Sequence, residues 1–110
     1  MYAIEKGLQK INGVVIDVFR RRIKNGHTKM VVEAGTNGYM GGCNRDCGSR
    51  AFLKLRCQTG DFYFEPIKDK QGRNVGVTIA CCGDDGLSAF LCAMAFAFEA
   101  LTDQIRETNK

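Results

Sequence analysis

The sequence predicts a single α+β domain, residues 1–110, in which about five antiparallel strands form a meander packed on a long C-terminal helix. Two observations support this. Through about residue 80, runs of β-branched and aromatic residues alternate with turn residues such as Asn-Gly. After that point, large apolar residues recur at spacings of three and four, which is the period of a helix.

The N-terminal segment, residues 1–11, carries a mixed pattern. Its large apolar residues fall on one face of a helix: Met1, Ile4, Leu8 and Ile11. Asn12-Gly13 would end that helix. Gly7 is a poor helix former, so a strand is the alternative. We therefore expect a short N-terminal helix, with a strand as the second interpretation.

A β-hairpin is predicted for residues 14–33. The segment 14–23 is rich in β-branched and aromatic residues, and a second such run occupies 28–33. Asn25-Gly26 lies between them, and both residues tolerate the positive φ of a type I′ turn. This is the strongest short-range hairpin signal in the chain.

Three further strands follow a glycine-rich stretch. They are predicted at 50–57, 62–65 and 75–81, with a polar loop at 69–74. Pro66 cannot donate a hydrogen bond to a sheet, so the middle strand either ends at Pro66 or lies on an edge.

The C-terminal helix is apolar nearly all round. Asp84 or Asp85 can cap its N-terminus. The helical stripe is Leu87, Leu91, Met94, Phe98, Leu101 and Ile105. The opposite side is also apolar, with Ala89, Phe90, Cys92, Ala93, Phe96, Ala97 and Ala100. One sheet covers one side only, so the other side faces the N-terminal helix or another subunit, and we favour homo-oligomerisation through this helix.

Charge is distributed unevenly along the chain. Residues 1–57 hold 11 Lys/Arg and 4 Asp/Glu, a net +7, whereas residues 58–110 hold 5 and 8, a net −3. Clustered positive charge favours an anionic partner, and the alternative is a solvated basic face. Direct nucleic-acid binding is not favoured, because the isoelectric point of 8.8 is modest and no nucleic-acid-reading motif occurs.

The sequence also bears on location. Its longest apolar candidate, Leu87–Leu101, is shorter than the ~20 residues of a spanning helix and contains Glu99. The N-terminus has neither the basic start nor the apolar stretch of a secretory signal. We expect a cytoplasmic protein that does not engage a membrane.

The glycine-rich segment is the candidate binding site. Glycines let backbone N–H groups turn inward as an anion-binding nest, although they can also serve a bent connection alone. The segment is neither a P-loop nor a dinucleotide fingerprint. Around the glycines, Thr36 and Asn37 offer polar groups, Tyr39 a stacking face, and two arginines bidentate charge. The candidate ligand-binding residues are Gly35, Thr36, Asn37, Gly38, Tyr39, Gly41, Gly42, Arg45 and Arg50.

The run Glu33-Ala-Gly-Thr-Asn-Gly-Tyr-Met-Gly-Gly42, followed by Gly48-Ser-Arg50, resembles a motif of short bacteriophage and mobile-element proteins. That motif is Glu-x-Gly-Thr-x-Gly-x-x-Gly-Gly, then a turn with Asp and His, then Gly-x-Arg. The resemblance covers residues 31–56. Cys43 and Cys47 stand about where the group has Asp and His. It implies a phage or mobile-element origin, a setting in which small non-enzymatic proteins counter host defences.

Six cysteines and one histidine allow several interpretations. Without a secretory signal, the thiols are expected to be reduced, and Cys57, Cys81 and Cys92 to be small core residues. Cys43 and Cys47 could supply two zinc ligands, completed by Cys81-Cys82 or by His27. They could equally form a redox pair or be ordinary loop cysteines. Paired Cys-x-x-Cys motifs are missing, so we predict no metal site and no cofactor.

No nucleophile, base and orienting group occur in a recognisable pattern. Glu33 could act as a base, and Asp84-Asp85 could bind a metal, although capping explains the latter pair better. We therefore predict a non-enzymatic binding protein that captures an anionic nucleotide-like ligand, as a sponge for a host immune signalling nucleotide. The alternatives are an anti-CRISPR-like inhibitor of a host nuclease, and a zinc or thiol-redox module.

Overall fold

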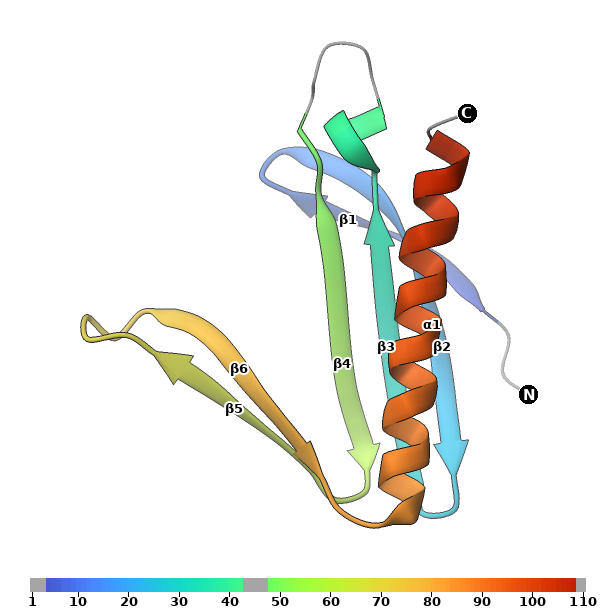
Figure 1. Cartoon of the computed structure of the whole chain (residues 1–110), viewed down its shortest axis with the longest axis vertical. Helices are drawn as coiled ribbons and strands as arrows, with labels where there is room; N and C mark the ends of the chain where they lie inside the picture. Colours follow the sequence, from blue (N-terminus) through green and yellow to red (C-terminus); the bar gives the residue numbers. More distant parts are fainter. Residues whose placement is uncertain (1–3, 43–47, 109–110) are drawn as a thin grey trace.

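A computed structural model describes residues 4–42 and 48–108 and confirms the α+β class. Within these residues, six antiparallel strands form two sheets beside one long C-terminal helix (Figure 1). The elements in chain order are β1 (Glu5–Ile11), β2 (Val14–Asn25), β3 (Thr28–Thr36), the short 3₁₀ segment η1 (Tyr39–Gly42), β4 (Ala51–Thr59), β5 (Phe62–Lys68), β6 (Asn74–Cys81) and α1 (Asp84–Thr108). The larger sheet has the order β1-β2-β3-β4, and β5 pairs with β6.

The expected N-terminal helix is wrong, and the alternative, a strand, is confirmed. β1 pairs with β2 from Glu5 opposite Arg20 to Ile11 opposite Val14. Asn12 and Gly13 have φ values of 46° and 84°, the positive values of a tight hairpin turn. Asn12-Gly13 is therefore a second Asn-Gly hairpin turn rather than a helix stop, which explains why six strands form instead of about five.

The other five predicted strands are present, but they do not form one meander on the helix, because β5 and β6 form a separate two-stranded sheet. The β2–β3 hairpin turns at Asn25 and Gly26, as the sequence predicts. β5 does not end at Pro66, because the strand continues to Lys68 with Pro66 opposite Val77. In a two-stranded sheet both strands are edges, so the edge alternative for Pro66 is the correct one.

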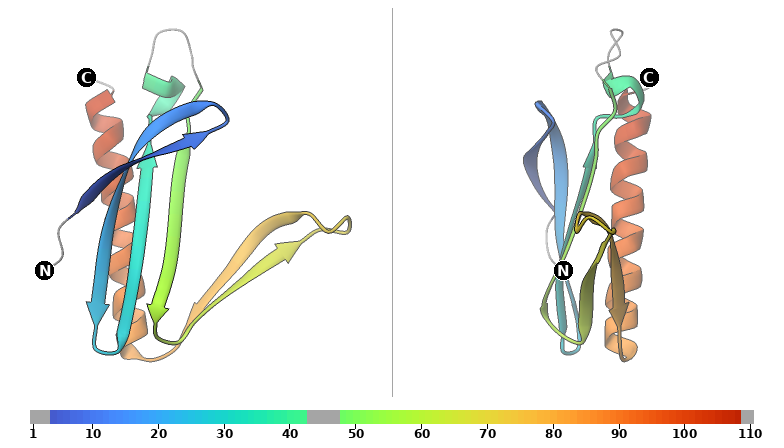
Figure 2. Two further views of the ribbon diagram at one scale, coloured as in Figure 1. Left: turned by 180° about the vertical axis from the view of Figure 1, so that it is seen from behind. Right: turned by 90° about the vertical axis from the view of Figure 1, so that its left-hand side faces the viewer.

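The core lies between α1 and the middle of the four-stranded sheet. Figure 2 shows the helix and this sheet as two layers. The buried residues that form the core come from both layers: Ile23, Met30, Val32 and Ala34 from the sheet, and Ala89, Ala93, Phe96 and Ala97 from α1. The alanine side of α1 thus contacts the sheet, and short side chains let the two backbones approach closely.

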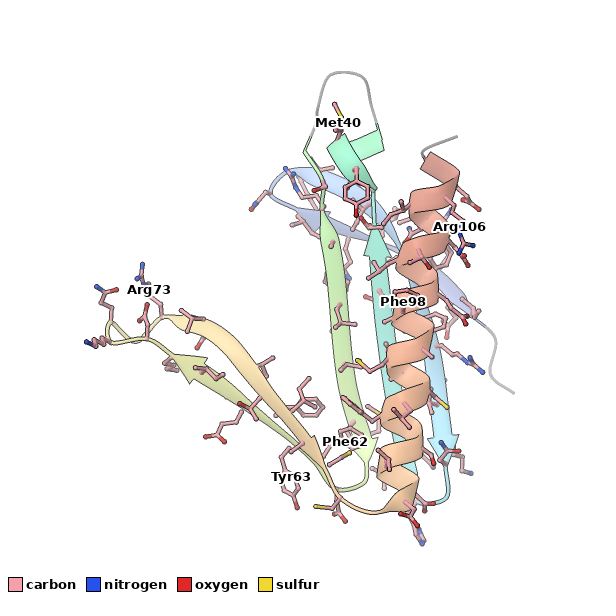
Figure 3. The ribbon with its side chains drawn as sticks, in the orientation of Figure 1. Met40, Phe62, Tyr63, Arg73, Phe98 and Arg106 are labelled. Atoms are coloured by element: carbon pink, nitrogen blue, oxygen red, sulfur yellow. The ribbon has the colours of Figure 1, made fainter. Side chains whose placement is uncertain are left out.

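Part of the predicted apolar stripe of α1 faces away from this core, whereas its Leu101 packs against the core. Leu87, Leu91 and Phe98 are 51%, 59% and 69% exposed. In Figure 3 the Phe98 side chain lies on the helix, away from the strands. Because residues 5–11 form β1, a strand of the sheet, the N-terminal helix that the sequence suggested as a cover for this side of α1 is not formed by these residues.

Neither aspartate at the start of α1 is seen to cap it through a side chain. The Leu87 N–H donates to the Gly83 carbonyl oxygen at 2.9 Å, which is the first bond of the helix. The Asp85 carboxylate instead accepts a hydrogen bond from the His27 N–H at 3.3 Å. Asp85 therefore ties the helix start to the β2–β3 turn.

By length and composition alone, residues Asp84–Glu107 could cross a membrane, with a mean hydropathy of 1.4 over the best 18-residue window. A mostly buried core helix can meet the same criterion, and 28% of this window is buried in the fold. This criterion alone therefore assigns no location to the protein.

The β5–β6 hairpin forms an arm that diverges from the rest of the molecule (Figures 1 and 2). At its base, the Phe62 ring packs against Phe90 of α1, with ring centroids 6.3 Å apart. At its tip, the Asp69 carboxylate accepts hydrogen bonds from the N–H groups of Gln71 and Arg73 and from the Arg73 guanidinium. The Arg73 N–H makes the largest contribution to holding the pKa of Asp69 below its usual value. Hydrogen bonds of Asp69 thus hold the turn at the tip, whereas the strands between the base and the tip diverge from the rest of the molecule.

Gly35 is where β2 crosses closely over β3. A Cβ atom built on Gly35 would lie 2.7 Å from the Val18 Cα and closer still to the Asp17 carbonyl oxygen. Both neighbours are backbone atoms, which cannot rotate away. The missing side chain of Gly35 therefore has a packing role, because it allows β2 to bend over the sheet.

We predict that Gly35→Ala destabilises the fold by about 1–3 kcal/mol, because the added methyl group forces the β2 and β3 backbones apart. Urea unfolding followed by circular dichroism measures this change. Gly7→Ala is the control, since its Cβ would meet only Val18 Cγ2 at 3.6 Å. Equal stabilities of the two variants would contradict the close approach at Gly35.

Candidate functional site

The glycine-rich loop begins at Thr36, whose side chain is buried and fully used by the loop itself. Its hydroxyl donates a hydrogen bond to the Arg50 carbonyl oxygen at 2.6 Å and accepts one from the Gly38 N–H at 3.1 Å. The sequence suggested that this hydroxyl contacts a ligand. In the structure it closes the first turn of the loop and joins that turn to the residue that precedes β4.

Asn37 joins the two described ends of the loop. Its side-chain oxygen accepts a hydrogen bond from the Arg50 N–H at 2.6 Å, and its amide nitrogen donates to the Gly48 carbonyl oxygen at 3.3 Å. These two bonds fix Gly48 and Arg50 beside the end of β3. Asn37, like Thr36, therefore holds the shape of the loop.

The Arg50 guanidinium binds backbone carbonyl groups. Its Nε donates to Ile11 at 3.0 Å, and its Nη1 donates to Gly48 and Ser49 at 3.2 and 3.3 Å. Its Nη2 donates to Asn12 at 3.4 Å. A guanidinium has five N–H groups, so these bonds leave one on Nη2 for another acceptor. Arg50 thus ties the loop to the β1–β2 turn and keeps its positive charge there, but it is not placed as a bidentate phosphate clamp.

Gln104 of α1 completes the framework, and sequence reasoning missed it. Its side-chain oxygen accepts a hydrogen bond from the Thr36 N–H at 3.1 Å, and its amide nitrogen donates to the Asp17 carbonyl oxygen at 2.9 Å. It therefore links α1 to both β3 and β2. The available signal was a glutamine between Leu101 and Ile105, on a helix that the sequence describes as mostly apolar.

Tyr39 is the exposed aromatic residue of the loop. It is 68% exposed, and it begins η1, in which Met40 and Gly41 have φ values of 59° and 72°. The Gly41 N–H donates to the Gly38 carbonyl oxygen at 3.1 Å. Gly38 also has a positive φ, of 85°. These glycines therefore serve the turn, which presents the Tyr39 ring outward.

Two cavities flank the end of β3. The first has a volume of about 210 Å³ and is lined by Thr36, Gly38, Tyr39, Ser49, Arg50, Ala51, Leu101 and Ile105. The second, of about 350 Å³, is lined by Lys6, Val15, Ile16, Asp17, Phe19, Thr36, Asn37, Gly41, Gln104 and Glu107. Sites for small molecules commonly measure roughly 300–1,000 Å³. The first cavity thus fits part of a nucleotide, for which it offers an aromatic ring, a serine hydroxyl and a guanidinium.

Three of the candidate residues, Arg45, Cys43 and Cys47, lie outside the described residues. Gly42 ends η1, and Gly48 is the first residue described after the gap. His27 precedes β3, at the opposite end of that strand from the loop. A nine-residue strand spans roughly 30 Å, so His27 lies far from both residues that flank the gap.

The described cysteines are all free: Cys57, Cys81, Cys82 and Cys92. Partial burial raises the pKa of the Cys57 thiol, which makes it less reactive near neutral pH. Across residues 4–42 and 48–108, no group of three or more His, Cys, Asp or Glu side chains is arranged to hold a metal ion.

The sheet face opposite α1 is basic. Its cationic residues occupy alternate positions on three adjacent strands: Arg20, Arg22, Lys24, Lys29, Lys54 and Arg56. Among them lies the buried Glu33, whose carboxylate accepts a hydrogen bond from the Gln9 amide at 3.2 Å. The sequence suggested Glu33 as a base. The structure surrounds it with cations and a glutamine, and the surface around it is suited to an anionic partner.

The chain matches no protein-family model, no curated protein and no solved structure.

We predict that Thr36→Val destabilises the protein by about 1–3 kcal/mol, because the buried Gly38 N–H loses its acceptor and the Arg50 carbonyl loses a donor. Amide hydrogen exchange at Gly38, with urea unfolding, measures the effect. Thr102→Val is a matched control, since the Thr102 hydroxyl bonds only to carbonyl oxygens one turn earlier in α1. Unchanged protection of Gly38 would contradict the assigned role of Thr36.

Proposed function

We propose that this protein is a non-enzymatic binding protein that captures a small anionic, nucleotide-like ligand at the cavity beside Tyr39. The observation that carries the proposal is an exposed aromatic ring on a firmly bonded turn, next to the positive charge of Arg50. An aromatic side chain provides a stacking surface for a base, and a nearby cation favours a phosphate.

The rigidity of the loop supports binding rather than catalysis. The polar groups of Thr36, Asn37 and Arg50 form hydrogen bonds within the protein. The cavity therefore keeps its shape without a ligand. A preformed site loses less entropy when a ligand binds. Among the described residues around this cavity, no nucleophile stands beside a base, as covalent or acid–base chemistry would need.

The resemblance of residues 31–56 to short phage and mobile-element proteins suggests the biological setting. In that setting the ligand is a host immune signalling nucleotide, and the protein acts as a sponge in the cytoplasm of an infected bacterial cell. Sequestration requires tight binding and no turnover, which agrees with a non-enzymatic site.

The basic sheet face favours a second candidate function, the inhibition of a host nuclease by direct contact. Six cations on one open face would steer the protein toward an acidic protein surface. In this case a nuclease co-purifies in stoichiometric amount from a host lysate. In the case of a sponge, a small molecule co-purifies instead.

We predict that isothermal titration calorimetry against cyclic nucleotides and ADP-ribose derivatives detects at least one ligand, and that Tyr39→Ala weakens its binding by about 1–3 kcal/mol through loss of stacking. Tyr63→Ala is the matched control, since Tyr63 is an exposed tyrosine of the β5–β6 arm. Uniform absence of binding across the panel, or equal binding by both variants, would remove the proposal.

A further inference from the structure

From Phe62 to Pro66, one face of the β5–β6 arm is apolar. In the register of the hairpin, Phe62 lies opposite Cys81, Phe64 opposite Ile79 and Pro66 opposite Val77. Residues paired across two strands share a face of the sheet. The other face is mixed, because it carries Glu65 and Thr78. The arm is therefore amphipathic, and its apolar face is stabilised when another surface shields it from water.

Within residues 4–42 and 48–108, the chain covers only the base of this face. Phe62 packs against the core cluster and Phe90, whereas Phe64 and Val77, further along the arm, are 40% and 56% exposed. Figure 3 shows the arm diverging from β4 and α1 beyond Phe62. A two-stranded hairpin alone is at best marginally stable in water. Something outside the chain must therefore pack on the arm.

A second unpartnered apolar surface lies on the same chain. It consists of the stripe on α1, with Leu87, Leu91 and Phe98, and of Leu53 on β4. Leu53 lies opposite Ala34, which places it on the helix side of the sheet, and it is more than half exposed. No charged residue occurs in α1 between Asp85 and Glu99. This surface, which we call the helix stripe, is as apolar as the arm face.

We propose that a second copy of this chain covers the helix stripe, and that each copy lays the apolar face of its β5–β6 arm on the α1 of the other. A two-fold dimer closed in this way buries both unpartnered surfaces of each chain in one assembly. The exposed large side chains involved are Leu53, Phe64, Val77, Leu87, Leu91 and Phe98. Burying them would supply part of the roughly 800 Å² that each partner usually contributes to a stable interface.

The lengths and charges of the two surfaces agree with this partner. From Phe62 to Lys68 the arm spans roughly 20 Å, and from Leu87 to Glu99 the helix spans roughly 18 Å. The arm tip is net positive, with Lys68, Lys70 and Arg73 against Asp69. The C-terminal half of α1 is net negative, with Glu99, Asp103 and Glu107 against Arg106. If the base of one copy's arm lies on Leu87 of the second copy, the basic tip of that arm reaches the acidic C-terminal half of the second copy's α1.

Sedimentation velocity tests the proposal. We expect wild-type protein at twice the monomer mass of 12.2 kDa. Val77→Glu and Leu91→Glu should each raise the dimer dissociation constant more than roughly tenfold, because each would bury an unpaired carboxylate. Both side chains are exposed in the monomer, so circular dichroism should be unchanged. Ala80→Glu, which changes the other face of the same strand, is the matched control and should remain dimeric.

A mixture of the two disruptive variants identifies the contact itself. The arm of the Leu91→Glu chain and the helix of the Val77→Glu chain are both intact, so the mixture should recover dimers that neither variant forms alone. Failure to recover them would overturn the arm-to-helix contact. A monomeric wild-type protein would overturn the dimer, and its flotation with phosphatidylglycerol vesicles would assign the helix stripe to a membrane instead. Neither substitution touches the cavity beside Tyr39, so this experiment is independent of the proposed function.

Discussion

The contact between three alanines of α1 and the centre of the sheet determines the arrangement of this molecule. Ala89, Ala93 and Ala97 are nearly or completely buried against β3, where Met30 and Val32 fill the space between the layers. Because alanine is small, the helix lies close to the sheet along this line. That closeness brings Gln104 within hydrogen-bonding distance of Thr36 and Asp17, and so connects the helix to the loop.

The same contact leaves three larger side chains of α1, Leu87, Leu91 and Phe98, exposed on the outside, whereas Phe96 is buried. The sheet covers one side of the helix, and the side with Leu87, Leu91 and Phe98 is the apolar surface on which the proposed dimer contact depends. Leu101 and Ile105 line the cavity beside Tyr39 at the C-terminal end of α1, whereas Leu87 and Leu91 lie toward its N-terminal end.

Local signals predicted most of the fold. Asn25-Gly26 fixed one hairpin, and the three-and-four spacing fixed the helix. The sequence did not reveal which side of α1 packs inward, because both sides are apolar and periodicity cannot rank them. Asn12-Gly13 was ambiguous for a similar reason, since the same dipeptide can end a helix or turn a hairpin. Residues 5–11 form a strand because they pair with β2, and local sequence signals do not reveal that pairing.

The glycine-rich composition indicated a candidate site, but it did not indicate what each side chain does there. Thr36, Asn37 and Arg50 bond to residues that are brought close only by the fold.

The free energy of unfolding of Ala93→Leu, measured by urea denaturation, tests the alanine contact most directly. Ala93 is completely buried against the sheet, so a larger side chain must push the layers apart. The packing described above predicts a loss of about 1–3 kcal/mol, while Ala95→Leu on the exposed side of α1 is tolerated. A variant Ala93→Leu as stable as the wild type would contradict it, because the leucine stripe rather than the alanines would then face the sheet.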